Sequence, residues 1–119
     1  QELEILGSGR QRKSYLEVRE CVQAMIHCVK HADEPVNVFN IGSMDSVDVT
    51  EIADIVVKKM GLEGVRYRYT GGIDGRGWKG DVKVMLLSIG KIQELGWKPQ
   101  GGSAQAIEMA VEALLRDLA

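Results

Sequence analysis

The alternation of apolar and polar residues in the first third of the chain predicts two strands with a helix between them. An apolar alternation predicts a strand at residues 3–6. Apolar residues then recur at helical spacing over residues 18–32, and Pro35 ends this helix. The β-branched run VNVFNI at residues 36–41 is followed by turn-forming residues, and it predicts a short buried strand.

The middle of the chain carries clear helix and strand signals. Asp48 and Glu51 form a capping-box pattern at the start of a second helix, and Gly61 stands where such a helix ends. The strict alternation VRYRY at residues 65–69 predicts a half-buried strand. The segment TGGIDGRGWKGD at residues 70–81 has five glycines, so we expect an irregular loop that is the candidate for a functional site.

Two helices are predicted after that loop. Ser88 is expected to cap a short helix that runs through Leu95, and Ser103 is expected to cap the last helix. The alternation of strands and helices predicts an α/β fold in a single domain over residues 1–119. The apolar stripes of these elements predict a core of Val22, Met25, Ile26, Val38, Ile41, Ile52, Ile55, Val56 and Leu114.

Composition excludes several classes of protein. The 119 residues carry a formal charge of -2 and only 5% aromatic residues, which argues against a nucleic-acid binder and against an aromatic base-stacking platform. No apolar run reaches the roughly 18 residues of a membrane span, and no signal peptide opens the chain. We therefore expect a cytoplasmic protein without a membrane partner. Because the chain begins at Gln1 and enters a strand at once, we expect it to be part of a longer protein.

The two cysteines are not expected to form a disulfide or a metal site. Cys21 and Cys28 lie seven residues apart on the first predicted helix, which separates their Cα atoms by about 10 Å. A metal site would need closer spacing and additional ligands. Both thiols are therefore expected to be buried in the core.

Basic residues gather in two stretches that border glycine-rich loops. Residues 5–16 carry three basic side chains and no acidic one, and residues 65–80 carry four against Asp74 alone. The two stretches either converge on one compact anion or form two separate solvated surfaces, and their spacing alone does not decide between these alternatives.

Two catalytic or cofactor motifs are excluded by the pattern. Gly7 and Gly9 follow a strand as in a dinucleotide-binding loop, but Arg12 stands where the third glycine must allow close packing. The histidines, His27 and His31, have no recognisable partner for a catalytic triad. The sequence therefore predicts neither an NAD site nor catalytic residues within this chain.

Four short motifs in order resemble one enzyme family. They are GSGRQRKSYLEVRECV at residues 7–22, VFNIGS at 38–43, GD at 80–81 and LGWKP at 95–99. Together they resemble the C-terminal, substrate-binding part of extended short-chain dehydrogenase/reductases that act as NAD-dependent nucleotide-sugar epimerases and dehydratases. The resemblance implies that the N-terminal Rossmann region of that fold is absent from this chain.

The resemblance also implies a set of substrate-binding residues. Lys13 takes the place of a basic residue, usually Arg, that contacts the pyrophosphate in this family. In the second family motif, R-P-G-D, this chain has Trp78 in the Arg place and keeps Asp81, which lies at the ribose side in the family. Asp81 would accept hydrogen bonds from the ribose hydroxyls. The positive charge that the Arg of this motif supplies to the phosphates would come from Arg76 or Lys79 instead. Trp78 would cover the sugar or base. Each of these roles is an expectation from the resemblance.

The family's redox machinery is missing from the sequence. Its enzymes bind NAD on an N-terminal Rossmann domain and use a Tyr-x-x-x-Lys pair, but no tyrosine here has a lysine four residues later. The resemblance therefore implies a substrate-binding portion that is not catalytically competent alone. Its implied partners are a nucleotide sugar, the Rossmann domain of the same protein and, for the full-length protein, a second copy in a homodimer. Two alternatives stay open, a free-standing anion-binding or regulatory α/β module and a complete small enzyme.

Overall fold

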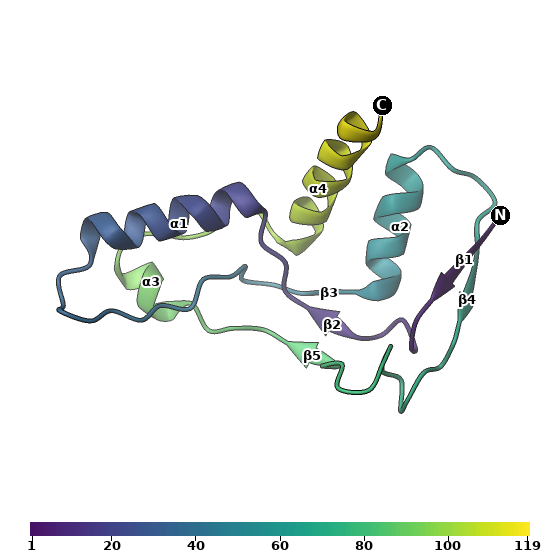
Figure 1. Ribbon diagram of the computed structural model, residues 1–119, viewed down its shortest axis with the longest axis horizontal. Helices are drawn as coiled ribbons and strands as arrows, with labels where there is room; N and C mark the ends of the chain where they lie inside the picture. Colours follow the sequence, from purple (N-terminus) through teal and green to yellow (C-terminus); the bar gives the residue numbers. More distant parts are fainter.

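The elements of the molecule lie in one flat, open arrangement. The computed structural model describes all 119 residues. Its elements in chain order are β1 (Glu2–Ile5), β2 (Arg12–Lys13), α1 (Val18–His31), β3 (Val47–Asp48), α2 (Val49–Lys59), β4 (Arg66–Tyr69), β5 (Val84–Met85), α3 (Gly90–Glu94) and α4 (Ser103–Leu118). In Figure 1, α1 and α3 lie at one end, β1 and β4 lie at the other, and α2 and α4 stand side by side between them. The predicted α/β fold is confirmed.

The dimensions show how open this arrangement is. The molecule measures 53 × 37 × 19 Å and has a radius of gyration of 16.9 Å, whereas a compact domain of this length would have a radius of gyration of about 13.5 Å. Only 15 of the 119 residues are buried. None of the helices is both long and apolar enough to cross a membrane.

The strands form two small sheets. β1 and β4 pair in parallel, with Glu2 opposite Arg66 and Ile5 opposite Tyr69. β2 is the central strand of the other sheet, where it pairs antiparallel with β3 and parallel with β5. This central place of β2 brings residues from three distant parts of the chain to one location.

Local signals set the ends of α2 as predicted. The Asp48 carboxylate accepts a hydrogen bond from the Glu51 amide at 2.8 Å, and the Glu51 carboxylate accepts one from the Asp48 amide at 2.7 Å. Gly61 follows the C-cap with a φ of +65°, a left-handed conformation that glycine adopts without a steric cost. The capping box and the glycine stop are both confirmed.

The two predicted serine caps are wrong. α3 begins after Ile89, which is buried, and Ser88 makes no cap with its side chain. α4 begins after Gly102, and the Asp45 carboxylate accepts the hydrogen bond from the Ser103 amide at 2.7 Å. The Ser103 hydroxyl is instead buried in a network, where it accepts a hydrogen bond from the Tyr15 amide at 2.9 Å. In both helices a contact with a distant part of the chain therefore stands where a local serine cap was predicted. At α3 this contact is the packing of Ile89 in the core, and at α4 it is the hydrogen bond from the Ser103 amide to Asp45.

The strand predicted at residues 36–41 is also absent. This segment is extended, but its backbone groups make no hydrogen bonds with other backbone groups. A strand exists only where a neighbouring strand completes the hydrogen-bond ladder, and this chain places none beside the segment. The pattern predicted the extended conformation but could not supply the missing neighbour.

The core is smaller than predicted and lies elsewhere. Ala24, Ile89 and Ile92 form its buried centre, and Cys28, Phe39, Ile41 and Trp97 pack against them. The prediction is wrong for five residues that are between 48% and 72% exposed, namely Val22, Met25, Ile26, Val38 and Leu114. It is only partly right for Ile41, Ile52, Ile55 and Val56, which are half-buried. The apolar stripes face outward because the flat arrangement provides nothing to cover them.

The prediction that both cysteines are buried in the core is only partly right. Cys21 and Cys28 are free thiols, which confirms that they form no disulfide. Both are half-buried rather than fully buried, because α1 is covered on only one side.

Candidate ligand-binding site

The site is built on β2, whose two residues point in different directions. The Arg12 guanidinium lies 3.5 Å from the Asp48 carboxylate and 3.3 Å from that of Glu51. Lys13 is directed to the loop at residues 70–81, where its Nζ lies 2.7 Å from Asp81 Oδ1. The alternation of side chains along a strand therefore separates a structural ion pair from the candidate site.

The glycine-rich loop at residues 70–81 folds back against the turn between β1 and β2. The Ser8 amide donates to the Gly75 carbonyl at 3.0 Å, and the Gly71 amide donates to the Gly7 carbonyl at 3.0 Å. Gly7 has a φ of +82° and no room for a Cβ beside Gly75 and the Gln11 side chain. The glycines of the turn and of the loop thus allow two segments that are far apart in the sequence to lie in contact.

Asp81 is the most buried charged side chain of the site, with its side chain only 1% exposed. Besides Lys13, its carboxylate accepts a hydrogen bond from the Gly77 amide at 3.1 Å and a long one from Gln11 Nε2 at 3.5 Å. The hydrogen bond from Lys13, followed by that from Gly77, holds the pKa of Asp81 below its ordinary value. The carboxylate is therefore ionised at neutral pH.

Trp78 and Arg76 complete the group around Asp81. The Lys13 ammonium lies 5.4 Å from the centre of the Trp78 ring, within the range of a cation–π interaction. The Trp78 side chain is otherwise largely open to solvent. Arg76 Nε donates to the Asp81 carbonyl at 3.1 Å, and its guanidinium pairs with Asp74 at the same distance.

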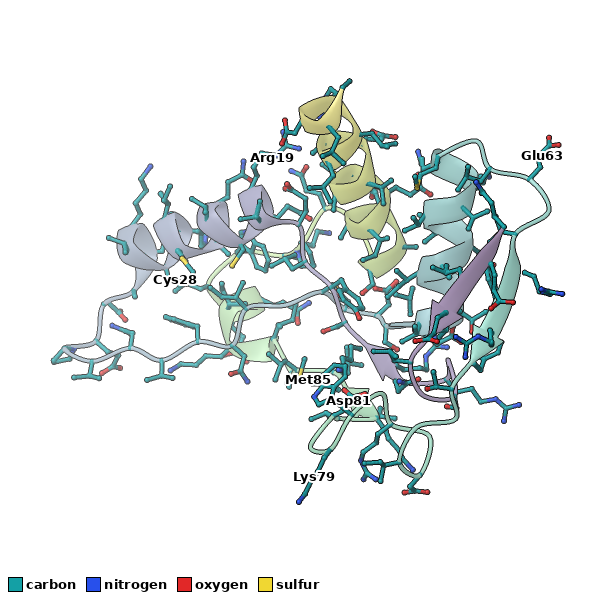
Figure 2. The ribbon with its side chains drawn as sticks, turned by 45° about the vertical axis from the view of Figure 1, so that its right-hand side comes forward. Arg19, Cys28, Glu63, Lys79, Asp81 and Met85 are labelled. Atoms are coloured by element: carbon teal, nitrogen blue, oxygen red, sulfur yellow. The ribbon has the colours of Figure 1, made fainter.

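The structure brings together four of the five predicted site residues. Lys13, Arg76, Trp78 and Asp81 converge, whereas Lys79 makes no ion pair or hydrogen bond and extends away from Asp81 into solvent (Figure 2).

The wider basic stretch at residues 65–80 does not converge as a whole. Arg66 and Arg68 on β4 pair with Glu2 on β1, and Arg68 pairs with Glu4 as well. Of the basic residues in the two stretches, Lys13 and Arg76 therefore lie near one another because both contact Asp81, whereas Arg66 and Arg68 are paired with acidic residues elsewhere.

A cleft of about 430 Å³ adjoins these residues. Its walls are mostly apolar and come from β1, α2 and the turn after β1, and its charged lining residues are Glu4, Lys13 and Asp81. Leu6, Gln11 and Trp78 line it as well. An apolar cleft that also has charged lining residues suits a ligand that has both a flat or apolar part and an anionic part.

Sequence reasoning missed Gln11. Its side chain is buried, and its Nε2 donates to the Leu6 carbonyl at 3.0 Å as well as to Asp81. Its Oε1 is buried without a hydrogen-bond partner. The available signal was its position two residues before Lys13, because residues i and i+2 share one face of an extended segment.

Comparisons with known proteins identify the fold. The chain is 28% identical over 117 residues to a GDP-L-fucose synthase of Sinorhizobium fredii, and the match covers 98% of this chain and 35% of that protein. It superposes on the crystal structure of a UDP-galactose 4-epimerase with a TM-score of 0.81 and 37% identity, over 98% of this chain and 36% of the other. The chain belongs to the extended short-chain dehydrogenase/reductases.

A second solved structure supports this assignment. The UDP-glucose 4-epimerase of Thermotoga maritima, determined with UDP-glucose, superposes with a TM-score of 0.77 and 27% identity. That match covers 99% of this chain and 36% of the epimerase. No family model matches the sequence. The chain thus spans about a third of the length of the extended short-chain dehydrogenase/reductases that it matches.

Proposed function

We propose that residues 1–119 form one domain that binds the nucleotide-sugar substrate of an NAD-dependent epimerase or dehydratase. The observation that carries the proposal is the convergence of Lys13, Arg76 and Trp78 beside an apolar cleft. This convergence occurs in a chain whose fold matches that of UDP-sugar 4-epimerases. The resemblance assigns this domain to the C-terminal part of such an enzyme.

In this proposal the pyrophosphate of the substrate lies against the basic groups. Lys13 uses one of its ammonium hydrogens for Asp81 and has others for phosphate oxygens. Arg76 adds positive charge beside Asp81, and Lys79 adds positive charge from the solvent side of the loop. The exposed ring of Trp78 covers the sugar or the base. Asp81 belongs to the same site at the ribose side.

The glycine turn of this chain does not suit NAD. A dinucleotide-binding loop ends at the amino terminus of a helix, where amide groups face the pyrophosphate. Here Gly7 and Gly9 are followed by β2, and the amide of Gly7 is already bonded to the Thr70 hydroxyl at 2.9 Å. We therefore assign NAD, the catalytic tyrosine and its lysine to a Rossmann domain in the rest of a longer enzyme.

The uncovered apolar surface supports the presence of such a partner domain. α1 exposes Val18, Val22, Met25, Ile26 and Val29 at helical spacing along one face. The segment at residues 36–41 beside this helix makes no hydrogen bond with other backbone groups. Exposed apolar area of this extent marks a docking surface in a soluble protein. We expect the complete enzyme to be a cytoplasmic homodimer.

Binding of UDP-glucose to the 119-residue chain tests the proposal. In a Trp97→Phe background, Trp78 is the only tryptophan, so its fluorescence reports on occupation of the site. Lys13→Ala should weaken binding by about 10- to 100-fold, since a charge-assisted hydrogen bond contributes about 1.5–3 kcal/mol. Lys30→Ala, which changes an exposed lysine in the last turn of α1, is the matched control and should bind as the parent does.

Two results would contradict the proposed function. One is an affinity for UDP-glucose that Lys13→Ala leaves unchanged. The other is conversion of UDP-glucose to UDP-galactose by the chain with added NAD, because a hydride acceptor site and a general base would then have to exist within these residues. Parallel titrations with UDP and GDP would identify the base.

A further inference from the structure

Two serine hydroxyls are completely buried at the start of α4. Ser43 and Ser103 are each 0% exposed, and their Oγ atoms lie 2.8 Å apart. The Asp45 carbonyl oxygen lies 3.0 Å from Ser103 Oγ and 3.2 Å from Ser43 Oγ. Each hydroxyl has one hydrogen to donate, so one serine donates to the other, and that other donates to the Asp45 carbonyl. The two side chains are therefore satisfied within the protein and form a fixed pair.

Ser103 also bonds to the segment that joins β2 to α1, beside which α4 begins (Figure 1). The backbone hydrogen bonds between this part of the chain and β5 end with the Ser14 amide, which donates to the Met85 carbonyl at 3.1 Å. The next amide, that of Tyr15, donates to Ser103 Oγ at 2.9 Å instead of to a backbone carbonyl. Ser103 therefore supplies the acceptor that a neighbouring strand supplies to the residues before it.

Tyr15 is the residue through which this contact reaches the cleft. Tyr15 lines the cleft of about 430 Å³, whereas Ser43 and Ser103 do not. A hydrogen bond on the Tyr15 amide restricts the backbone conformation at Tyr15, and the backbone conformation decides which side-chain rotamers are allowed. The buried serine pair thus acts on the cleft at one remove, through the backbone of Tyr15.

We propose that Ser103 is a positioning residue, whose hydroxyl holds the Tyr15 backbone so that the Tyr15 side chain keeps its place in the cleft. The Ser43 hydroxyl and the Asp45 carbonyl hold Ser103 Oγ in turn. The part of this proposal that concerns a ligand rests on the proposed function. The part that concerns the Tyr15 amide applies to the chain without any ligand, so the two can fail separately.

The first arm of the test measures amide hydrogen exchange in the chain without ligand. Ser103→Ala removes the hydroxyl but keeps the amide through which Asp45 caps α4. It should raise the exchange rate of the Tyr15 amide about tenfold. The Ala106 amide, which is bonded at 3.0 Å in the first turn of α4, should stay protected and so report that the helix is intact. Ser88→Ala, at an exposed serine that makes no cap for α3, is the matched control and should leave both rates near the parent values.

Ser43→Ala separates this specific contact from a general loosening of the buried pair. Without the Ser43 hydroxyl, Ser103 Oγ still accepts from the Tyr15 amide and still donates to the Asp45 carbonyl. The Tyr15 amide should therefore remain close to its parent exchange rate in Ser43→Ala. Equal rises in Ser43→Ala and Ser103→Ala, or an unchanged Tyr15 rate in Ser103→Ala, would overturn the proposal.

The second arm is a double-mutant cycle with UDP-glucose as the probe, read from Trp78 fluorescence in the Trp97→Phe background. Ser103→Ala should weaken binding by about 2- to 10-fold, because a Tyr15 side chain that is no longer held has to be ordered when the ligand binds. In a Tyr15→Ala background this loss should disappear. Additive losses, or an unchanged affinity in Ser103→Ala, would overturn the ligand part of the proposal. A parent chain that does not bind UDP-glucose would refute the proposed function, and the first arm would still decide whether Ser103 holds Tyr15.

Discussion

The small core around Ile92 allows a quantitative test of the fold. Ile92 is fully buried beside Ala24 and Ile89, where α3 meets α1. Ile92→Ala removes three methyl or methylene groups, worth about 0.8 kcal/mol each as transfer free energy. The cavity left behind adds to this loss, so the free energy of unfolding should fall by about 3–4 kcal/mol. That is a large part of the roughly 6–18 kcal/mol expected for 119 residues.

Ile26 supplies a matched control for this substitution. It is the same residue type on α1, but it is 48% exposed and faces away from the core. Ile26→Ala should therefore cost about 1 kcal/mol or less, because about half of the transfer term applies and no cavity forms. The free energy of unfolding is measured by urea denaturation followed by circular dichroism at 222 nm.

The comparison of the two variants decides whether the core lies where the structure places it. Equal losses in Ile92→Ala and Ile26→Ala, or a loss below 1 kcal/mol in Ile92→Ala, would refute the reasoning. Ile92→Val, with an expected loss of about 0.5–1.5 kcal/mol, keeps the test valid if the alanine variant does not fold.

Two further predictions concern local interactions. Asp48→Ala removes the hydrogen bond to the Glu51 amide and should lower the free energy of unfolding by about 0.5–2 kcal/mol in urea denaturation, whereas Asp33→Ala at an exposed position should change it little. The hydrogen bond from Tyr67 to Asp54 raises the pKa of Tyr67 to about 12, so its contribution to stability is complete below pH 10 and is lost as pH rises through 12. Absorbance titration at 295 nm should show the raised midpoint of Tyr67 in the parent, and Asp54→Asn should lower that midpoint.

The sequence predicted best what depends on near neighbours. The ends of α2 follow from Asp48, Glu51 and Gly61, whose effects operate within a few residues. The signals at α2 hold because no distant part of the chain competes with them. The alternation in VRYRY also predicted β4, and there the distant partner strand, β1, is present.

Prediction failed where the outcome depends on a distant partner. The segment at residues 36–41 has the composition of a strand, but no neighbouring strand completes it. The apolar face of α1 has the periodicity of a core helix, yet nothing in the chain covers Val22 or Ile26. In both cases the pattern describes a surface suited to burial, and it carries no information about whether the burying surface is present.

The candidate site could be predicted from the sequence only in part. No spacing rule connects Lys13 with Asp81, which is 68 residues away, so their proximity was expected only from the family resemblance. Gln11 could have been included because it shares a face with Lys13. The burial of Asp81 could not have been foreseen, since it arises from the turn at Gly77 and from the return of the loop to β2.

The parallel pairing of β1 with β4 has a consequence for the order of folding. It joins Glu2 to Arg66 and so closes a chain segment of more than sixty residues, at an entropic cost about 1.6 kcal/mol above that of a ten-residue loop. α2 lies inside that segment and can form early from its own capping signals. We therefore expect β1 to dock only after α2 has formed. Because β1 and α2 supply opposite parts of the cleft lining, the cleft is completed only when β1 has docked.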